Sequence, residues 1–130
     1  MAGIALLDTH ALLWALMQPQ RLSEAARNVI EDPGEVLLVS GATAWEISIK
    51  RQLGKLSGAE GALDGFEAHL ARLTATPLPI SLGHAIEAGH LPLHHHDPFD
   101  RMLIAQARLE GVPIITNDAA SEAYDVDSLW

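Results

Sequence analysis

The sequence predicts an α/β fold, a three-layer α/β/α sandwich with a central parallel sheet. Short uncharged apolar runs, typical of buried strands, alternate with longer stretches whose apolar residues recur at helical spacing. Strands separated by helices form parallel sheets through right-handed crossovers. The chain has 130 residues, of which 48% are hydrophobic, so it is long enough to bury one core. We therefore expect a single domain over residues 1–130.

Six segments have the spacing of helices. In the first, Leu12 and Leu16 lie four residues apart, and Pro19 follows its end. Several predicted helices begin at a residue suited to the N-cap position, among them Ser23 and Asp97. The side chain of such a residue accepts a hydrogen bond from a free N–H group of the first turn. Glycines close three of the six predicted helices, at Gly54, Gly89 and Gly111. The predicted helices are 9–17, 23–30, 43–53, 63–73, 81–88 and 98–110.

Five segments are predicted strands. The first two are apolar runs bounded by turn or capping residues. The third contains Pro77 and Pro79, which suit the edge of a sheet because proline has no N–H to donate to a neighbouring strand. The predicted strands are 4–7, 36–40, 76–80, 112–116 and 124–126.

Composition limits the function classes. The formal charge of −9, with 17 acidic residues against 8 Lys and Arg, argues against nonspecific nucleic-acid binding through a broad basic face. A site that approaches phosphate through divalent cations needs acids at its centre and only a few local bases, so nucleic acid stays possible. An acidic surface that keeps the protein soluble explains the same charge. No glycine-rich phosphate loop follows a strand, which excludes the common dinucleotide and nucleotide-triphosphatase sites.

The sequence also indicates a compartment. No apolar run is long enough to span a membrane, and no basic segment precedes an apolar core at the amino terminus. The chain contains no cysteine, so it has neither disulfides nor thiolate metal sites. We expect a soluble cytoplasmic protein that does not associate with membranes.

Four acidic residues are predicted at one edge of the sheet. Asp8 and Asp118 each follow a strand, while Glu46 and Asp100 are expected in the first turns of helices. In a β–α–β unit the helix amino termini lie at the same edge as the carboxyl ends of the strands, which is where ligands collect. Residues far apart in sequence are therefore expected to converge there.

Each of these acids also has a purely structural explanation. Thr43 and Glu46 have the spacing of a capping box, and Asp97 with Asp100 resembles one. Asp8 and Asp118 suit the N-cap position of the helical turns that follow them. Four acids at one edge nevertheless favour a shared role over four separate caps.

Mutual repulsion points to a cation. Two carboxylates about 5 Å apart repel by roughly 3 kcal/mol at an effective dielectric near 20, so a hard divalent ion such as Mg²⁺ or Mn²⁺ would neutralise the group. Such an ion polarises phosphate and activates water for phosphodiester hydrolysis. We expect Asp8 and Asp100 as core metal ligands, Asp118 completing the shell or holding a second ion, and Glu46 orienting or deprotonating the water. Expected supporting hydrogen bonds come from Thr9, Ser40, Thr116 and Asn117.

Several other residues have competing interpretations. His94, His95 and His96 suggest zinc, but adjacent side chains diverge, so a solvated loop is favoured. Arg101 could meet a substrate phosphate or pair with a nearby acid. Lys50 could contact a nucleic-acid substrate or form an ion pair with Glu46 four residues earlier. The tryptophans Trp14 and Trp45 are expected in core or dimer packing rather than in base stacking.

The sequence resembles the PIN domain family, and within it the VapC-type ribonuclease toxins of toxin–antitoxin pairs. The matching segments are Leu6-Leu7-Asp8-Thr9-His10 with Leu13-Trp14, Val39-Ser40, Trp45-Glu46-Ile47 with Lys50, Gly54-Lys55-Leu56, Asp97-Pro98-Phe99-Asp100-Arg101 with Ala105-Gln106-Ala107, and Ile115-Thr116-Asn117-Asp118. The resemblance places Asp8, Glu46, Asp100 and Asp118 on the family's acidic site. It implies Mg²⁺-dependent RNA cleavage, a cognate antitoxin protein that blocks the site, and a homodimer.

Two other functions stay open from the sequence. The acids could hold a structural ion or serve as caps in a binding module that acts through protein partners alone. The same site could also hydrolyse DNA or a small phosphate ester, because the contacts that would recognise a ribose 2′-hydroxyl are not visible in the sequence.

Overall fold

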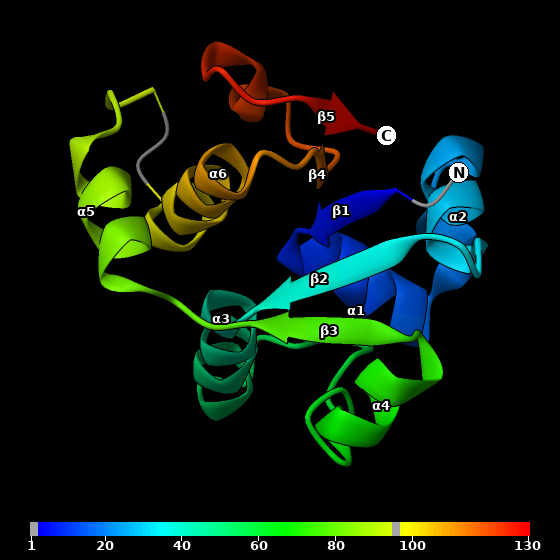
Figure 1. Cartoon of the computed structure of the whole chain (residues 1–130). Helices are drawn as coiled ribbons and strands as arrows, with labels where there is room; N and C mark the ends of the chain where they lie inside the picture. The colour runs from blue at the N-terminus through cyan, green and yellow to red at the C-terminus, as the bar shows by residue number, and fades with distance from the viewer. Residues whose placement is uncertain (1–2, 95–96) are drawn as a thin grey trace.

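The computed structural model describes residues 3–94 and 97–130 and contains a five-stranded parallel sheet in the order β3-β2-β1-β4-β5 (Figure 1). The strands are β1 (Ile4–Leu7), β2 (Val36–Ser40), β3 (Ala75–Leu78), β4 (Ile114–Ile115) and β5 (Ser128–Leu129). The α-helices are α1 (Thr9–Met17), α2 (Glu24–Glu31), α3 (Gly41–Gln52), α4 (Phe66–Arg72), α5 (Leu82–His90) and α6 (Pro98–Glu110), and the 3₁₀ helices are η1 (Pro19–Arg21) and η2 (Ala119–Ala123). The predicted α/β fold class is confirmed.

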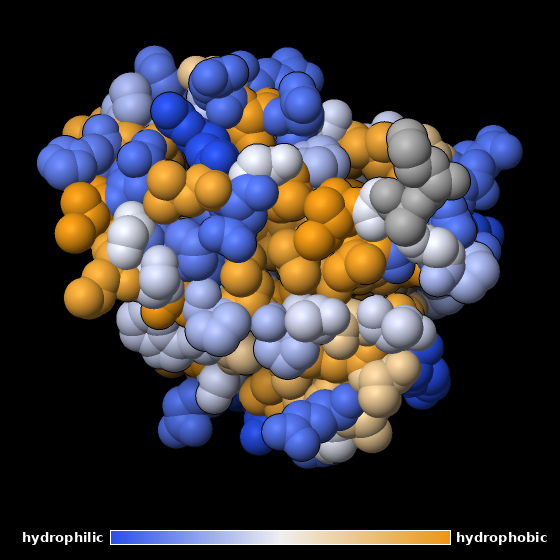
Figure 2. Space-filling view, viewed as in Figure 1, coloured by the Kyte–Doolittle hydropathy of each residue, from blue (hydrophilic) through white to orange (hydrophobic). Residues whose placement is uncertain are grey.

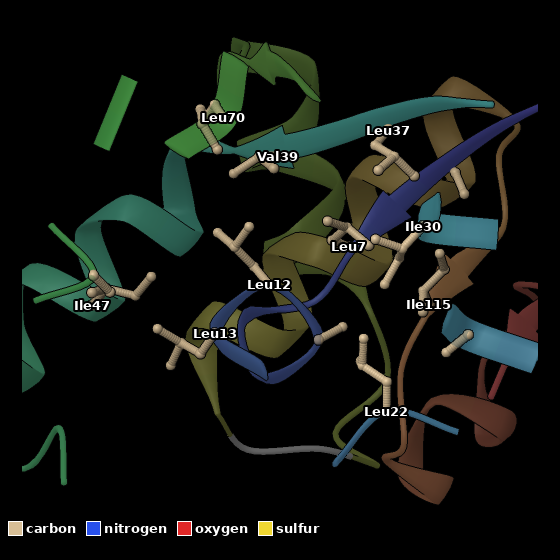
Figure 3. Packing of buried hydrophobic residues seen from close by; sticks show 14 of the residues in the cluster. Leu7, Leu12, Leu13, Leu22, Ile30, Leu37, Val39, Ile47, Leu70 and Ile115 are labelled. Atoms are coloured by element: carbon tan, nitrogen blue, oxygen red, sulfur yellow. The ribbon is translucent and has the colours of Figure 1, made fainter. Parts of the chain in front are cut away.

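Alternate residues of the central strands face opposite layers of helices. Leu7 of β1 lies in a cluster with residues of α1, α2 and α4, whereas its neighbour Leu6 lies in a cluster with Leu103 of α6. Figure 3 shows Leu12 of α1, together with Val39 of β2, in the first of these clusters. Strand residues point alternately to the two faces, so a sheet buried on both faces needs apolar residues at every position. This requirement explains the uninterrupted apolar runs of β1 and β2.

Most of the predicted ends coincide with observed ones. Ser23 caps α2 by accepting a hydrogen bond from the Ala26 N–H at 3.0 Å, and Asp97 caps α6. Gly111 ends α6 in the left-handed region, with φ of 68°, where a residue without Cβ is favoured. The predicted strand with prolines, β3, lies at the edge of the sheet as expected, although it ends at Leu78 and so contains Pro77 but not Pro79.

Several boundaries were predicted wrongly, among them those of α4, which begins at Phe66 and not at residue 63, and of β4, which is Ile114–Ile115 and not residues 112–116. Helix α3 begins at Gly41 and is capped by Ser40, so Thr43 is not its N-cap and Glu46 lies in its second turn. Gly89 lies inside α5 instead of ending it. The last strand is Ser128–Leu129 and not residues 124–126, because the backbone hydrogen bonds of β4 reach Asp127 and Leu129.

The fold brings the ends of several elements to one edge of the sheet. The carboxyl ends of β1, β2 and β4 lead into α1, α3 and η2, and α6 begins near the same edge. Within residues 3–94 and 97–130, no helix has the length and apolar character required to cross a membrane.

Candidate functional site

Asp8 lies where β1 ends and α1 begins. Its Oδ1 accepts a hydrogen bond of 2.7 Å from the Ala11 N–H, so the residue does cap the helix. The side chain is nevertheless buried, with 7% of its surface exposed. Burial raises the pKa of this carboxyl above its ordinary value, and the charge of Asp118 adds to that effect. Hydrogen bonds from Thr116 and Ala11, together with His10, lower the pKa in part.

Three of the four predicted acids line the same small pocket. Asp8, Asp100 and Asp118 reach it from the end of β1, the first turn of α6 and the end of β4. The pocket has a volume of about 10 Å³, about the space that one water molecule requires. Its remaining walls are Leu103, Ile104, Ile114, Thr116 and Ser121. The predicted convergence is therefore observed for these three residues.

Glu46 does not line this pocket. It is buried, with 4% exposure, and both of its oxygens are engaged. Oε1 accepts a hydrogen bond of 2.7 Å from the Thr9 hydroxyl, and Oε2 lies 2.7 Å from the Lys50 ammonium. Of the two interpretations of Lys50, the structure has the ion pair with Glu46. Because Thr9 follows Asp8 directly, Glu46 contacts the site through one intervening hydroxyl.

The expected supporting residues have different roles. Thr116 hydrogen-bonds to Asp8 and also accepts a hydrogen bond of 3.0 Å from the Asp118 N–H, so it contacts two of the acids. Ser40 caps α3, and Asn117 lines a neighbouring pocket together with Asp118. The sequence reasoning missed Ser121, whose hydroxyl donates a hydrogen bond of 2.9 Å to the Asp118 carbonyl. The spacing of three residues after Asp118, one turn of η2, is the signal that could have indicated it.

The donor set fits a hard cation. Three carboxylates line one pocket, and all of them supply the oxygen ligands that Mg²⁺ and Mn²⁺ prefer. A cation beside Asp8 would favour its ionised form, which burial disfavours. In the part of the chain that the structure describes, no three His, Asp or Glu side chains form a ready-made ligand group. An ion would therefore have to draw Asp100 and Asp118 toward Asp8.

Arg101 makes contacts that the sequence reasoning did not consider. Its guanidinium donates to the carbonyls of Ala88, Leu91 and Pro92 at 2.8–3.0 Å. It therefore holds the carboxyl end of α5, as basic side chains do near the last carbonyls of a helix.

The predictions for the tryptophans and for the three adjacent histidines are confirmed only in part. Trp14 packs against the core cluster of α1, as expected. Trp45 is 61% exposed and contacts Phe99 edge-on, so it is not a core residue. His94 contacts the Tyr124 ring, and His95 and His96 lie outside the described residues.

Comparison with known proteins supports this description. The family model for the PIN domain matches residues 5–127. Three of the similar solved structures are VapBC2 from Rickettsia felis bound to a promoter DNA fragment (15% identity, TM-score 0.73, 97% of each chain covered), DNA-bound VapBC from Salmonella typhimurium (18%, 0.67, 99% of this chain and 98% of that one), and VapBC-5, a member of the VapBC family of toxin–antitoxin systems, from Mycobacterium tuberculosis (18%, 0.57, 98% and 97%). No curated protein matches the sequence significantly.

Proposed function

The chain belongs to the PIN domain family, and from this membership we propose that it is a metal-dependent endoribonuclease that acts as the toxin of a toxin–antitoxin pair. One observation carries the proposal: Asp8, Asp100 and Asp118, from three separate elements, line one pocket at the carboxyl edge of the sheet. A set of caps needs no common pocket. The arrangement is the one expected if the three carboxylates share an ion.

Asp8 and Asp100 are the residues we assign as principal ligands of Mg²⁺ or Mn²⁺, with Asp118 completing the set. The bound ion would polarise the scissile phosphate and lower the pKa of a water molecule. Thr116 orients Asp8 and the Asp118 backbone from between them. Asp8 must be ionised to bind a cation, so its raised pKa makes binding weaker in acid.

Glu46 is assigned to orient or deprotonate the attacking water. In the described conformation Thr9 and Lys50 occupy its two oxygens. The Lys50 ammonium lies at Oε2, the oxygen that does not accept the Thr9 hydroxyl and would receive the proton of the water. The proposed role therefore requires Lys50 to exchange partners during the reaction, and Thr9 to keep Glu46 oriented meanwhile.

RNA is the proposed substrate because the sequence resembles the ribonuclease toxins of this family. A nuclease acting on DNA would use the same carboxylates, and the assay below includes that alternative. We propose the cytoplasm as the site of action, since the substrate is cellular RNA and the chain has no cysteine.

An antitoxin protein and a second copy of this chain are the proposed partners. Several similar structures are described as toxin–antitoxin systems or complexes. The chain also exposes large apolar residues on and beside α5, namely Leu82 at 85%, Ile86 at 61% and Leu93 at 69%. Figure 2 shows apolar surface over α5 at the left of the molecule. Apolar surface of this kind is typical of protein contacts.

Cleavage of RNA tests the proposed activity. Protein free of antitoxin is incubated with total cellular RNA, and separately with DNA, in Mg²⁺ or EDTA, and new 5′ ends are mapped. We expect discrete cuts in RNA that require Mg²⁺ and that Asp100→Asn reduces at least about 100-fold, since even residues that only support a metal ligand are worth about 10–100-fold.

Asp64→Asn is the matched control, because it makes the same change at a carboxylate whose side chain is 79% exposed and outside the pocket. Cuts that persist in EDTA or in Asp100→Asn would contradict a mechanism based on this pocket. A wild-type protein that binds its partner and cuts neither RNA nor DNA would favour the binding-module alternative.

A further inference from the structure

A second pocket contains three of the eight Lys and Arg side chains of the protein. It lies between α1, η1 and the segment after α3, with a volume of about 270 Å³. Both lysines of the chain, Lys50 and Lys55, line it together with Arg21 and His10. Its remaining walls are Leu13, Trp14, Met17, Gln18, Leu56, Ser57 and Ala59. This concentration is notable in a chain with a formal charge of −9.

The other basic side chains have partners elsewhere. Arg51 pairs with Asp64 at 3.1 Å, and Arg108 lies 3.9 Å from Glu87. Arg101 donates to three carbonyls, Arg27 donates to the Pro19 carbonyl at 2.6 Å, and Arg72 contacts the His69 ring at 3.0 Å. Lys55, by contrast, forms no ion pair with any residue in the described ranges 3–94 and 97–130. Arg21 and Lys55 thus line this pocket without an ion pair among the described residues, and both can meet an external anion.

Aromatic rings accompany these cations. The Arg21 guanidinium lies 4.5 Å above the centre of the Trp14 ring, which holds the cation in place through a cation–π contact. His10, which is exposed, lies 5.6 Å from Trp14 on α1. Sites for single-stranded nucleic acid combine cations that follow the backbone with rings on which bases stack.

Residues of this pocket adjoin residues of the carboxylate site on two sides. Lys50 contacts Glu46 at 2.7 Å, and His10 lies two residues after Asp8. On the other side the Trp14 ring contacts Trp130 at 5.5 Å, and Trp130 lines a pocket of about 370 Å³ that also contains Asp118. A strand lying in the basic pocket would therefore extend toward Asp118.

We propose that Arg21, Lys55 and, on release from Glu46, Lys50 bind the phosphodiester backbone of the single-stranded RNA that the neighbouring carboxylates cleave. The proposal rests on the proposed nuclease function and adds the part of the surface that holds the substrate. RNA fits better than an acidic protein segment because the exposed His10 ring offers a stacking surface, and because residues of the pocket adjoin carboxylates suited to metal and phosphate.

Salt-dependent binding tests the proposal. A short fluorescein-labelled oligouridylate is titrated in EDTA, so that metal-dependent cleavage does not occur, and anisotropy is measured at several salt concentrations. Each phosphate contact to a single strand contributes about 0.7 to the slope of log Kobs against log[salt]. We expect Arg21→Gln and Lys55→Gln each to reduce the magnitude of the slope by about 0.7, and the double variant by about 1.4, with several-fold weaker binding.

Arg51→Gln is the matched control, because it removes the same charge from a residue that follows Lys50 but pairs with Asp64 outside the pocket. Lys55→Arg keeps the charge and is expected to keep the slope. Thermal unfolding of every variant separates lost binding from lost folding. An unchanged slope in the double variant, an equal loss in Arg51→Gln, or failure of the wild-type protein to bind the RNA would overturn the proposal.

Two further arms separate this proposal from its alternatives. If the double variant loses binding of polyglutamate but keeps binding of RNA, the pocket binds an acidic protein and the proposal is wrong. Cleavage in Mg²⁺ is measured on the same proteins. If the wild-type protein cleaves RNA and the double variant keeps the wild-type salt slope, only the RNA-binding pocket is refuted. If the double variant loses slope but the wild-type protein does not cleave, the pocket is supported and the nuclease function is refuted.

Discussion

The Thr9 hydroxyl donates a hydrogen bond of 2.7 Å to Oε1 of Glu46, which joins the first turn of α1 to the second turn of α3. Both residues are buried, at 2% and 4% exposure. Thr9 also lies directly after Asp8, so this bond fixes Glu46 relative to the carboxylate pocket. One short contact thus connects the buried fourth acid to the other three.

Removal of this hydroxyl is expected to destabilise the protein. Thr9→Val keeps the shape of the side chain but leaves Glu46 Oε1 without this donor, and an unsatisfied buried polar group costs about 1–3 kcal/mol. The free energy of unfolding is measured by urea denaturation. Thr9→Ser retains the hydroxyl and is the control. Equal stability of Thr9→Val and the wild-type protein would mean that the bond contributes nothing net.

Arg101 is expected to affect stability and not the binding of RNA. Arg101→Gln removes a guanidinium that donates to carbonyls at the end of α5, and hydrogen bonds from a charged donor are worth about 1.5–3 kcal/mol. We expect a loss of about 2 kcal/mol in the free energy of unfolding, with an unchanged slope of RNA binding against salt. A reduced slope with unchanged stability would instead favour the phosphate contact that the sequence suggested.

The differences between sequence and structure have identifiable physical causes. Asp8 and Asp97 were predicted correctly because a cap depends on neighbours within one helical turn. Ser40 and Thr43 are both hydroxyl residues that can start a helix, and only the end of β2 determines that Ser40 does so. The carbonyls around Arg101 and the bond from Thr9 to Glu46 join segments distant in sequence. No local pattern specifies such pairs.

The acid pocket itself was predictable because sheet topology determines it. Once the strands are parallel, residues after β1 and β4 must lie at one edge, and the first turn of α6 lies there too. Glu46 was placed there by the same rule but on a helix start two residues too late. That small error moved it from the second turn to the first.

Divalent metal is expected to stabilise the folded protein. A ligand that binds only the native state adds about 2.7 kcal/mol at a concentration of 100 times its Kd, which for a domain of this size raises Tm by roughly 5–10 °C. Differential scanning fluorimetry with Mg²⁺ or Mn²⁺ against EDTA measures this shift. Asp100→Asn is expected to lose at least half of it, and the exposed Asp64→Asn to keep it. The same shift in all three proteins would refute binding at this pocket.

Asp8→Asn is expected to lower activity while raising stability. Burial raises the folded-state pKa of Asp8 above the ordinary value of 3.8, so between these two pKa values the native state binds more protons than the unfolded state. The protonated form of Asp8 therefore makes its full contribution to the free energy of unfolding below pH 3.8. That contribution is lost as the pH rises through the folded-state pKa. At neutral pH the wild-type protein must keep the buried Asp8 carboxylate ionised, which lowers its stability. The uncharged amide of the Asp8→Asn variant avoids this loss.

Urea unfolding in EDTA, measured from acid to neutral pH, checks this prediction. Asparagine can still accept the Ala11 N–H, so the cap is kept, and the variant is expected to be more stable than the wild-type protein at neutral pH but not in acid. Its metal-dependent cleavage is expected to fall at least about 100-fold. Asp32→Asn is the control, because Asp32 accepts the Gly34 N–H at 2.9 Å from an exposed position. If Asp8→Asn matches Asp32→Asn in stability and cleaves normally, Asp8 is a helix cap and nothing more.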